Sequence, residues 1–151
     1  MKISGQPISR PKDEFIVIPR DGQNVVFKAQ AVLDYTEFEK LCPEPEAPTK
    51  HYPDGHEEVN FNDHKYLKAR DSWATKRSSW LIIESLRITE GLEWDTVSYS
   101  DPETWSNYRK ELETTFATGE INAIIGTVMM ANSLNDSRFE EAKKLFLATQ
   151  Q

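Results

Sequence analysis

Hydrophobic positions near the start of the chain follow the pattern of paired β-strands. Residues 14–19 (EFIVIP) and 24–33 (NVVFKAQAVL) are rich in β-branched side chains, and the Asp-Gly pair between them supplies the positive φ values of a tight turn. Both faces of the first segment are apolar, with Phe15 and Val17 on one of them, so both can be covered. The pattern predicts a β-hairpin over residues 14–33.

The apolar spacing then changes from two residues to three. Asp34 stands where an N-cap is expected, ahead of a short helical face formed by Tyr35, Phe38 and Leu41. The segment that follows is rich in proline and acidic residues and has few large apolar groups. The pattern predicts a short helix over residues 34–42 and an extended, polyproline-like acidic loop over residues 43–61.

The longest helical pattern covers residues 66–86. Its apolar positions fall at helical spacing and form one stripe, made by Tyr66, Ala69, Trp73, Trp80 and Ile83. Most of the basic residues fall off this stripe and are expected to form a solvated basic face, made by Lys65, Lys68, Arg70 and Arg77.

Three further helices are indicated by their start signals. Asp101 followed by Pro102 marks the start of the first. Thr118 is expected to cap the second, and Asn135 or Asp136 the third. The residues expected to point inward repeat every three or four positions: Trp105, Tyr108, Leu112 and Phe116, then Ile121, Ile124, Ile125, Val128 and Met129, then Phe139, Ala142 and Phe146.

Together these elements predict an α+β fold in one domain over residues 1–151, in which the hairpin and loop precede a small bundle of about four helices at residues 62–147. A chain of 151 residues can bury enough surface to fold without metal or disulfide. Neither a signal peptide nor the ~20 apolar residues of a membrane span are visible. With its single cysteine, the chain is expected to be soluble and cytoplasmic.

The distribution of charge restricts the partners. A net charge of −7 argues against nucleic acid, whose affinity rests largely on Lys and Arg. Residues 34–64 hold nine acidic residues against two lysines, whereas residues 65–80 hold five basic residues against one aspartate. This contrast is typical of solvated charge, and it also allows two surfaces of opposite sign.

Side chains that could carry chemistry lack a recognisable arrangement. Residue types that bind zinc occur at Cys42, His51, His56 and His64. Their spacing, Cys-x8-His-x4-His-x7-His, lacks the close pair that anchors a zinc site. Cys42 continues an apolar pattern, which favours a buried thiol over a nucleophile. The glycines are dispersed, so we expect no phosphate-binding loop, no metal, no cofactor and no enzymatic activity.

The four tryptophans are many for this length, and tryptophan is enriched at protein interfaces. Trp73, Trp80 and Trp105 lie on helical stripes, which favours a place in the core. Trp94, in the stretch TEGLEWDTVSYS, has no stripe to join and is the best candidate for an exposed aromatic anchor. The residues predicted to contact a partner are Trp94, Lys68, Arg70, Tyr52, Trp73 and Trp80.

Long stretches of the chain resemble one known family. At the front they are EFIVIPR and VVFKAQAVLDYTEFEKLCPEPEAP, and at the rear TEGLEWDTVSYSDPETWSNYRKELETTFATGEINAIIGTVMMANSLNDSRFEEAKKLFL. With the lysine-rich helix between them they cover about residues 11–147. The family is that of the tail assembly chaperones of long-tailed bacteriophages and prophages. None of these stretches is a catalytic signature.

The resemblance implies a protein of the infected host's cytoplasm that binds the long, helical tape-measure protein and keeps it soluble until the tail tube polymerises around it. The major tail protein and a second copy of the chain are further possible partners. The residues themselves suggest an apolar groove between the rear helices, with the basic face of residues 66–86 orienting the bound chain. The alternative is a small acidic regulator or inhibitor, borne by a phage, that covers a basic site on a host protein.

Overall fold

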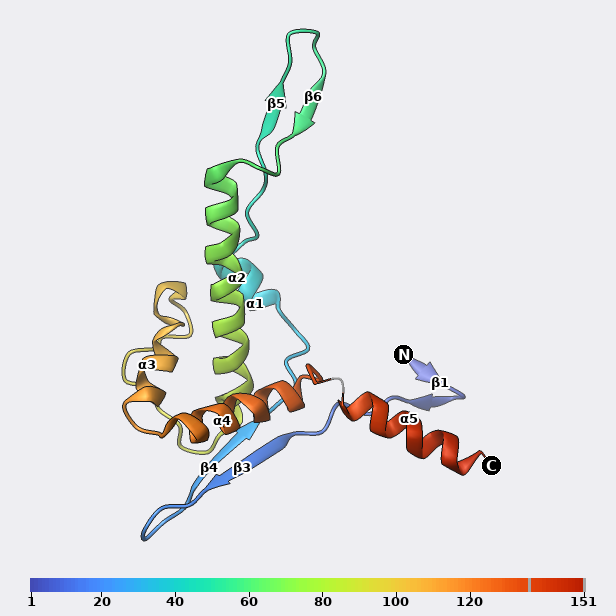
Figure 1. The fold of residues 1–151 in the computed structure, drawn as a ribbon, viewed down its shortest axis with the longest axis vertical. Coiled ribbons are helices and arrows are strands. Elements are labelled where there is room, and N and C mark those ends of the chain that lie inside the picture. Colours follow the sequence, from blue (N-terminus) through green and yellow to red (C-terminus); the bar gives the residue numbers. More distant parts are fainter. Residues whose placement is uncertain (136, 151) are drawn as a thin grey trace. The chain divides into compact units, whose positions relative to one another are not determined.

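The computed structural model describes residues 1–135 and 137–150 (Figure 1). Its strands and helices form an α+β fold, which confirms the predicted class. The chain divides into two compact units. Unit 1 contains Met1–Leu33, Glu84–Glu93 and Thr115–Gln151, and unit 2 contains Asp34–Ile83 and Trp94–Thr114.

The centre of unit 1 is an antiparallel ribbon of β3 (Glu14–Ile18) and β4 (Val25–Ala29), where a hairpin is predicted. Alternate side chains define an inner and an outer face of the ribbon. Helix α4 (Thr118–Ala131) packs on the inner face. The buried side chains of this layer are Ile18, Phe27 and Ala29 on the ribbon and Ile121, Ile124 and Val128 on the helix.

The second edge of β4 is closed by polar groups from the segment Glu84–Glu93. The Lys28 N–H donates to Thr89 Oγ1 (2.9 Å), and this hydroxyl donates to the Lys28 carbonyl oxygen (3.0 Å). Ser85 is fully buried, and its Oγ donates to the carbonyl oxygen of Gln30 (2.7 Å). In the described chain, β4 therefore has partners on both edges, whereas β3 pairs with a strand on one edge.

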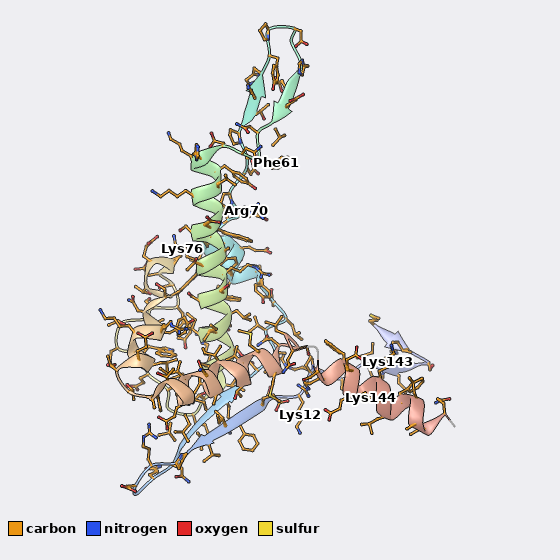
Figure 2. The ribbon with its side chains drawn as sticks, viewed as in Figure 1. Lys12, Phe61, Arg70, Lys76, Lys143 and Lys144 are labelled. Atoms are coloured by element: carbon orange, nitrogen blue, oxygen red, sulfur yellow. The ribbon has the colours of Figure 1, made fainter. Side chains whose placement is uncertain are left out.

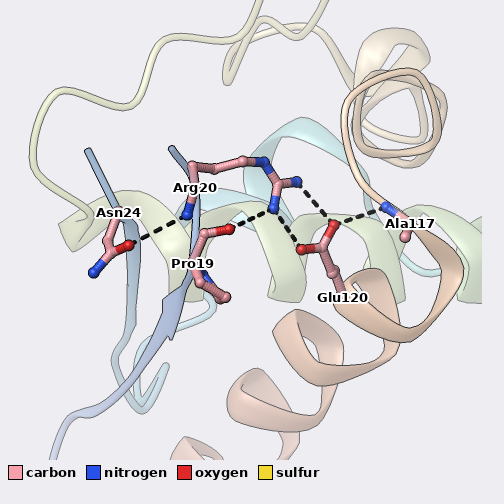
Figure 3. A network of polar contacts seen from close by, with 5 residues as sticks. All are labelled: Pro19, Arg20, Asn24, Ala117 and Glu120. Carbon is pink, nitrogen blue, oxygen red and sulfur yellow. Dashed lines mark hydrogen bonds and ion pairs between the residues drawn. The ribbon is translucent and has the colours of Figure 1, made fainter. Parts of the chain in front are cut away.

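Figure 3 shows how the turn of the ribbon is tied to the start of α4. Arg20 donates two hydrogen bonds to the Glu120 carboxylate (2.6 and 2.8 Å), and the Ala117 N–H donates a third (2.9 Å). These bonds favour the charged carboxylate, the arginine most of all, and lower the pKa of Glu120 to about 2. Thr118 was expected to be the cap. It is instead the first residue of α4, because Glu120 reaches back to the amide of Ala117.

The sequence does not predict a short hairpin and a 3₁₀ turn of unit 1. Strands β1 (Lys2–Ile3) and β2 (Gln6–Pro7) form a small hairpin, and its turn places Ser4 and Gly5 at positive φ. A 3₁₀ turn, η1 (Leu86–Ile88), follows the longest helix.

The last element of unit 1 is α5 (Ser137–Thr149). Asn135 Oδ1, one of the two predicted caps, accepts hydrogen bonds from the N–H (3.1 Å) and the hydroxyl (2.8 Å) of Ser137, the first residue of the helix. The other predicted cap, Asp136, lies outside the described residues.

The helices of unit 2 begin near their predicted starts. Helix α1 spans Thr36–Leu41, and Asp34 Oδ1 accepts from the Thr36 N–H (2.9 Å) just ahead of it. Helix α2 spans His64–Ser85 and belongs to unit 2 as far as Ile83. Asp101 accepts from the Glu103 N–H (3.1 Å) as predicted, but the pattern it starts is divided into a 3₁₀ turn, η2 (Pro102–Thr104), and α3 (Asn107–Glu113).

The acidic segment contains a hairpin where only an extended loop is predicted. Strands β5 (Thr49–His51) and β6 (Glu57–Val59) pair in antiparallel fashion. Tyr-Pro-Asp-Gly forms the turn between them, since the Gly55 N–H donates to the Tyr52 carbonyl oxygen (3.0 Å) and Gly55 has a φ of +91°. The prediction of a continuous loop over residues 43–61 is therefore wrong for residues 49–59.

Candidate functional site

Two of the predicted contact residues, Trp73 and Trp80, belong to an aromatic cluster around Phe38 in unit 2. Phe38 is 1% exposed, and its ring centroid lies 5.5–5.9 Å from those of Trp73, Trp80 and Trp105. Trp80 is 2% exposed, so it serves the core and is not available to a partner. Trp73 is half-buried, and its Nε1 donates to the carbonyl oxygen of Cys42 (3.1 Å).

Trp94 is not the exposed anchor that the sequence suggests. Its side chain is half-buried, and its Nε1–H is buried with no hydrogen-bond acceptor among the described residues. The next two residues are held by Glu111, whose carboxylate accepts from the N–H groups of Asp95 (2.7 Å) and Thr96 (3.0 Å). Burial raises the pKa of Glu111, but the hydrogen bonds outweigh it and leave this pKa below its ordinary value. The segment is thus a fixed part of unit 2.

Lys68 and Arg70 are both exposed on α2, but they do not form one basic face. A helix turns about 100° per residue, so Lys68 and Arg70, which are two positions apart, lie on nearly opposite sides of the helix. Other basic groups of α2 have local partners. Lys76 pairs with Glu103 (2.8 Å), and the Arg77 guanidinium lies 4.4 Å from the centre of the Tyr35 ring (Figure 2 labels Arg70 and Lys76). The predicted basic face is therefore divided around the helix.

Tyr52 is half-buried within the β5–β6 hairpin. Its ring stacks on His56 with centroids 4.3 Å apart and planes 6° apart, and the Lys50 ammonium lies 5.2 Å from the ring centre. The Tyr52 hydroxyl donates to Glu58 (3.2 Å). The Tyr52 side chain thus contacts three side chains of its own hairpin.

The residues considered for metal or nucleophilic chemistry do not converge. Within residues 1–135 and 137–150, no group of three or more His, Cys, Asp and Glu side chains is placed to hold a metal ion. His51 pairs with Glu57 (3.0 Å), and His56 contacts Asp54 within the same hairpin. Cys42 is half-buried, and burial raises the pKa of its thiol, which keeps it protonated at neutral pH.

A cavity of about 380 Å³ lies in unit 2. Small and hydroxyl-bearing residues of α2, with Ser106, Tyr108 and Arg109, line it. Burial raises the pKa of the Tyr108 hydroxyl. None of the described helices is long and apolar enough to cross a bilayer.

The largest departure from the expected packing is at α5, where no side chain is buried. The face of this helix that was predicted to point into the core is exposed to solvent. Phe139 is 57% exposed, Phe146 62% and Leu145 68%. Helical spacing places these three with Ala142 on one side of α5, and we call this set the α5 stripe. Leu147 is also exposed, but it lies about 140° around the axis from Ala142, whereas the other three residues lie within about 60° of Ala142. Lys143 and Lys144 extend from the same helix (Figure 2).

The ribbon of unit 1 carries a second exposed apolar surface. Its register pairs Phe15 with Lys28 and Val17 with Val26, so these side chains lie opposite to the buried inner face. Phe15 is 68% exposed, Val17 46% and Val26 41%, and we call these three residues the outer face. The sequence showed that both faces of β3 are apolar, but only one of them is covered.

Comparisons with models of protein families, with curated proteins and with solved structures give no match to this chain. The candidate site therefore rests on the geometry of the chain itself. It consists of two exposed apolar surfaces of unit 1, the α5 stripe and the outer face, neither of which was among the residues predicted to bind a partner.

Proposed function

We propose that this chain is a phage tail assembly chaperone, which binds the tape-measure protein in the host cytoplasm and keeps it soluble without catalysing a reaction. The observation that carries the proposal is the α5 stripe, an apolar helix face that its own chain leaves in contact with water. Amphipathic helices recognise other helices through residues at spacings of three, four and seven, the spacings that separate Phe139, Ala142 and Phe146. The resemblance supplies the identity of the partner.

Chaperone action on a long helical chain requires many modest contacts rather than one deep pocket. An exposed stripe of two aromatic rings and one leucine offers such a contact, because each ring buries a large apolar area when a partner covers it. Polar residues of α5 flank the stripe, including Glu140, Lys143 and Lys144, and keep the free helix hydrated.

Co-expression with the tape-measure protein encoded in the same genome tests the proposal. The wild-type chain is expected to retain the tape-measure protein on an affinity resin and to raise its soluble fraction. The double variant Phe139→Glu, Phe146→Glu is expected to lose both effects, while Leu147→Glu, which adds the same charge beside the stripe, retains them. Loss of neither effect in the double variant, or no retention by the wild type, would contradict the proposal.

A second candidate, binding to a basic site on a host protein, is favoured by the exposed carboxylates of the acidic segment. Glu37, Glu44, Glu46 and Asp54 are all exposed in unit 2. Binding of this kind depends strongly on salt, because exposed charges are screened over about 8 Å at physiological ionic strength. Retention of a partner that survives high salt therefore favours the α5 stripe, and retention that is lost favours the acidic segment.

A further inference from the structure

The two exposed apolar surfaces of unit 1 are similar in extent. The α5 stripe runs for two helical turns from Phe139 to Phe146, a rise of about 10 Å. The outer face extends about 7 Å along β3 from Phe15 to Val17 and about 5 Å across to Val26 on β4. A helix laid on a two-stranded ribbon in this way would cover all three ribbon side chains.

The α5 of the same chain begins on the wrong side of the ribbon to cover the outer face. Its first turn is held by Arg138, which pairs with Glu14 (3.1 Å) and donates to the Met130 carbonyl oxygen (3.0 Å). By alternation along β3, Glu14 belongs to the inner face, where α4 also packs. The stripe of one chain and the outer face of the same chain are therefore separated by the ribbon itself.

We propose that two copies of this chain associate reciprocally, with the α5 stripe of each copy packed on the outer face of the other. The described structure shows the exposed faces, and the second copy is the occupant that presents the complement of each. This inference concerns the free chain, because a tape-measure protein and a second copy would compete for the same α5 stripe.

The apolar area that two such contacts would bury supports a dimer with twofold symmetry. Taking about 200 Å² for an aromatic side chain and about 150 Å² for an aliphatic one, the exposed fractions of the six large side chains amount to roughly 600 Å² for one helix–ribbon contact. Stable interfaces bury about 1,200–2,000 Å² in total. One contact falls short of this range, whereas two reciprocal contacts reach it, and a twofold arrangement leaves no stripe free to extend the assembly.

Sedimentation of the purified full chain over a range of concentrations gives the first test. The wild type is expected to sediment as two chains, and Phe146→Lys or Phe15→Glu to raise the dimer Kd about tenfold or more. Leu147→Lys is the matched control for the helix, since it adds the same charge to an exposed leucine beside the stripe, and it is expected to dimerise like the wild type. Circular dichroism confirms that each variant is folded.

Mixing the two variants tests the reciprocal pairing. A mixed dimer of the Phe146→Lys and Phe15→Glu chains contains one unaltered contact, and its other contact places a lysine beside a glutamate. The mixture is therefore expected to dimerise more tightly than either variant alone. A monomeric wild type at 100 µM, a dimer insensitive to either substitution, or a mixture no tighter than its components would overturn the proposal. Insensitivity to Phe146→Lys alone would indicate pairing through the free edge of β3.

Discussion

Phe38 is the residue on which the core of unit 2 depends most directly, because its ring contacts three tryptophans and is 1% exposed. Its position on the short helical face of residues 35–41 could be predicted from spacing. The identity of its neighbours could not, since they come from segments 35 to 67 residues further along the chain.

We expect Phe38→Ala to lower the free energy of unfolding by about 3–5 kcal/mol, through lost burial and the cavity that remains. Urea denaturation followed by tryptophan fluorescence measures the change. Phe61→Ala is the control, because Phe61 is 63% exposed, and its effect is expected within about 0.5 kcal/mol. Equal losses of unfolding free energy in the two variants would show that the aromatic cluster around Phe38 does not stabilise the core of unit 2.

Glu120 gives the chain a defined response to acid. Its pKa of about 2 in the folded state lies below the ordinary value of 4.5, so its ion pair with Arg20 contributes stability that is complete above pH 4.5. This contribution is lost as the pH falls from 4.5 toward 2, because the unfolded chain then binds the proton first.

Glu120→Gln is therefore expected to lower stability at pH 7 and to flatten the fall in stability between pH 4.5 and 2. Thermal unfolding at several pH values measures both effects. Glu140→Gln on the exposed surface of α5 is the control. An unchanged pH profile in the Glu120 variant would mean that other carboxylates set the response to acid.

Among the elements, the sequence was most informative where a local signal decides the structure. The Asp-Gly turn of β3–β4, the Asp101 cap and the apolar spacing of α4 all correspond to observed elements. The Tyr-Pro-Asp-Gly turn at Gly55 was also a local signal, but the prolines around it suggested an extended loop instead. The pairing of β5 with β6 was therefore predictable in principle.

The pattern of α5 shows the limit of such arguments. Periodicity indicates that Phe139, Ala142 and Phe146 share one side of a helix, but it does not indicate what covers that side. The prediction that this side points inward assumed that another segment of the same chain packs against it. The same reasoning failed for Trp94, whose lack of a stripe suggested exposure although its indole nitrogen is buried.

Because α5 buries none of its side chains, its removal should cost the fold little. Truncation after Leu134 is expected to leave the unfolding free energy within about 1 kcal/mol when measured at a concentration where the chain is monomeric. Val128→Ala, at a position that is 0% exposed on α4, is the contrasting variant and is expected to destabilise more. A truncated chain that unfolds outright would show that α5 packs against its own unit.

At the scale of the whole molecule, each unit is assembled from segments that are distant in the sequence. Cutting the chain between residues 93 and 94 divides both units, because unit 1 includes residues 115–151 and unit 2 includes residues 94–114. This interleaving was not visible in the sequence, where composition changes only at the proline-rich segment.

Fragments 1–93 and 94–151 are therefore each expected to be unfolded alone and to regain structure when they are co-expressed. Dispersion of the amide signals in NMR spectra distinguishes these states. Fragment 1–134 is the matched control and is expected to fold, since it lacks only α5 and the residues around it. A folded 1–93 fragment would contradict the division into units.

The separation of β4 from α4 also has a consequence for synthesis on the ribosome. The ribbon is complete once residue 29 has been made, but the helix that covers its inner face begins only at Thr118. At 5–20 residues per second, translation of the intervening segment takes roughly 5–20 seconds. During that interval Ile18 and Phe27, which are buried in the folded chain, are exposed to solvent. The nascent chain would therefore benefit from a bound chaperone until α4 has been made.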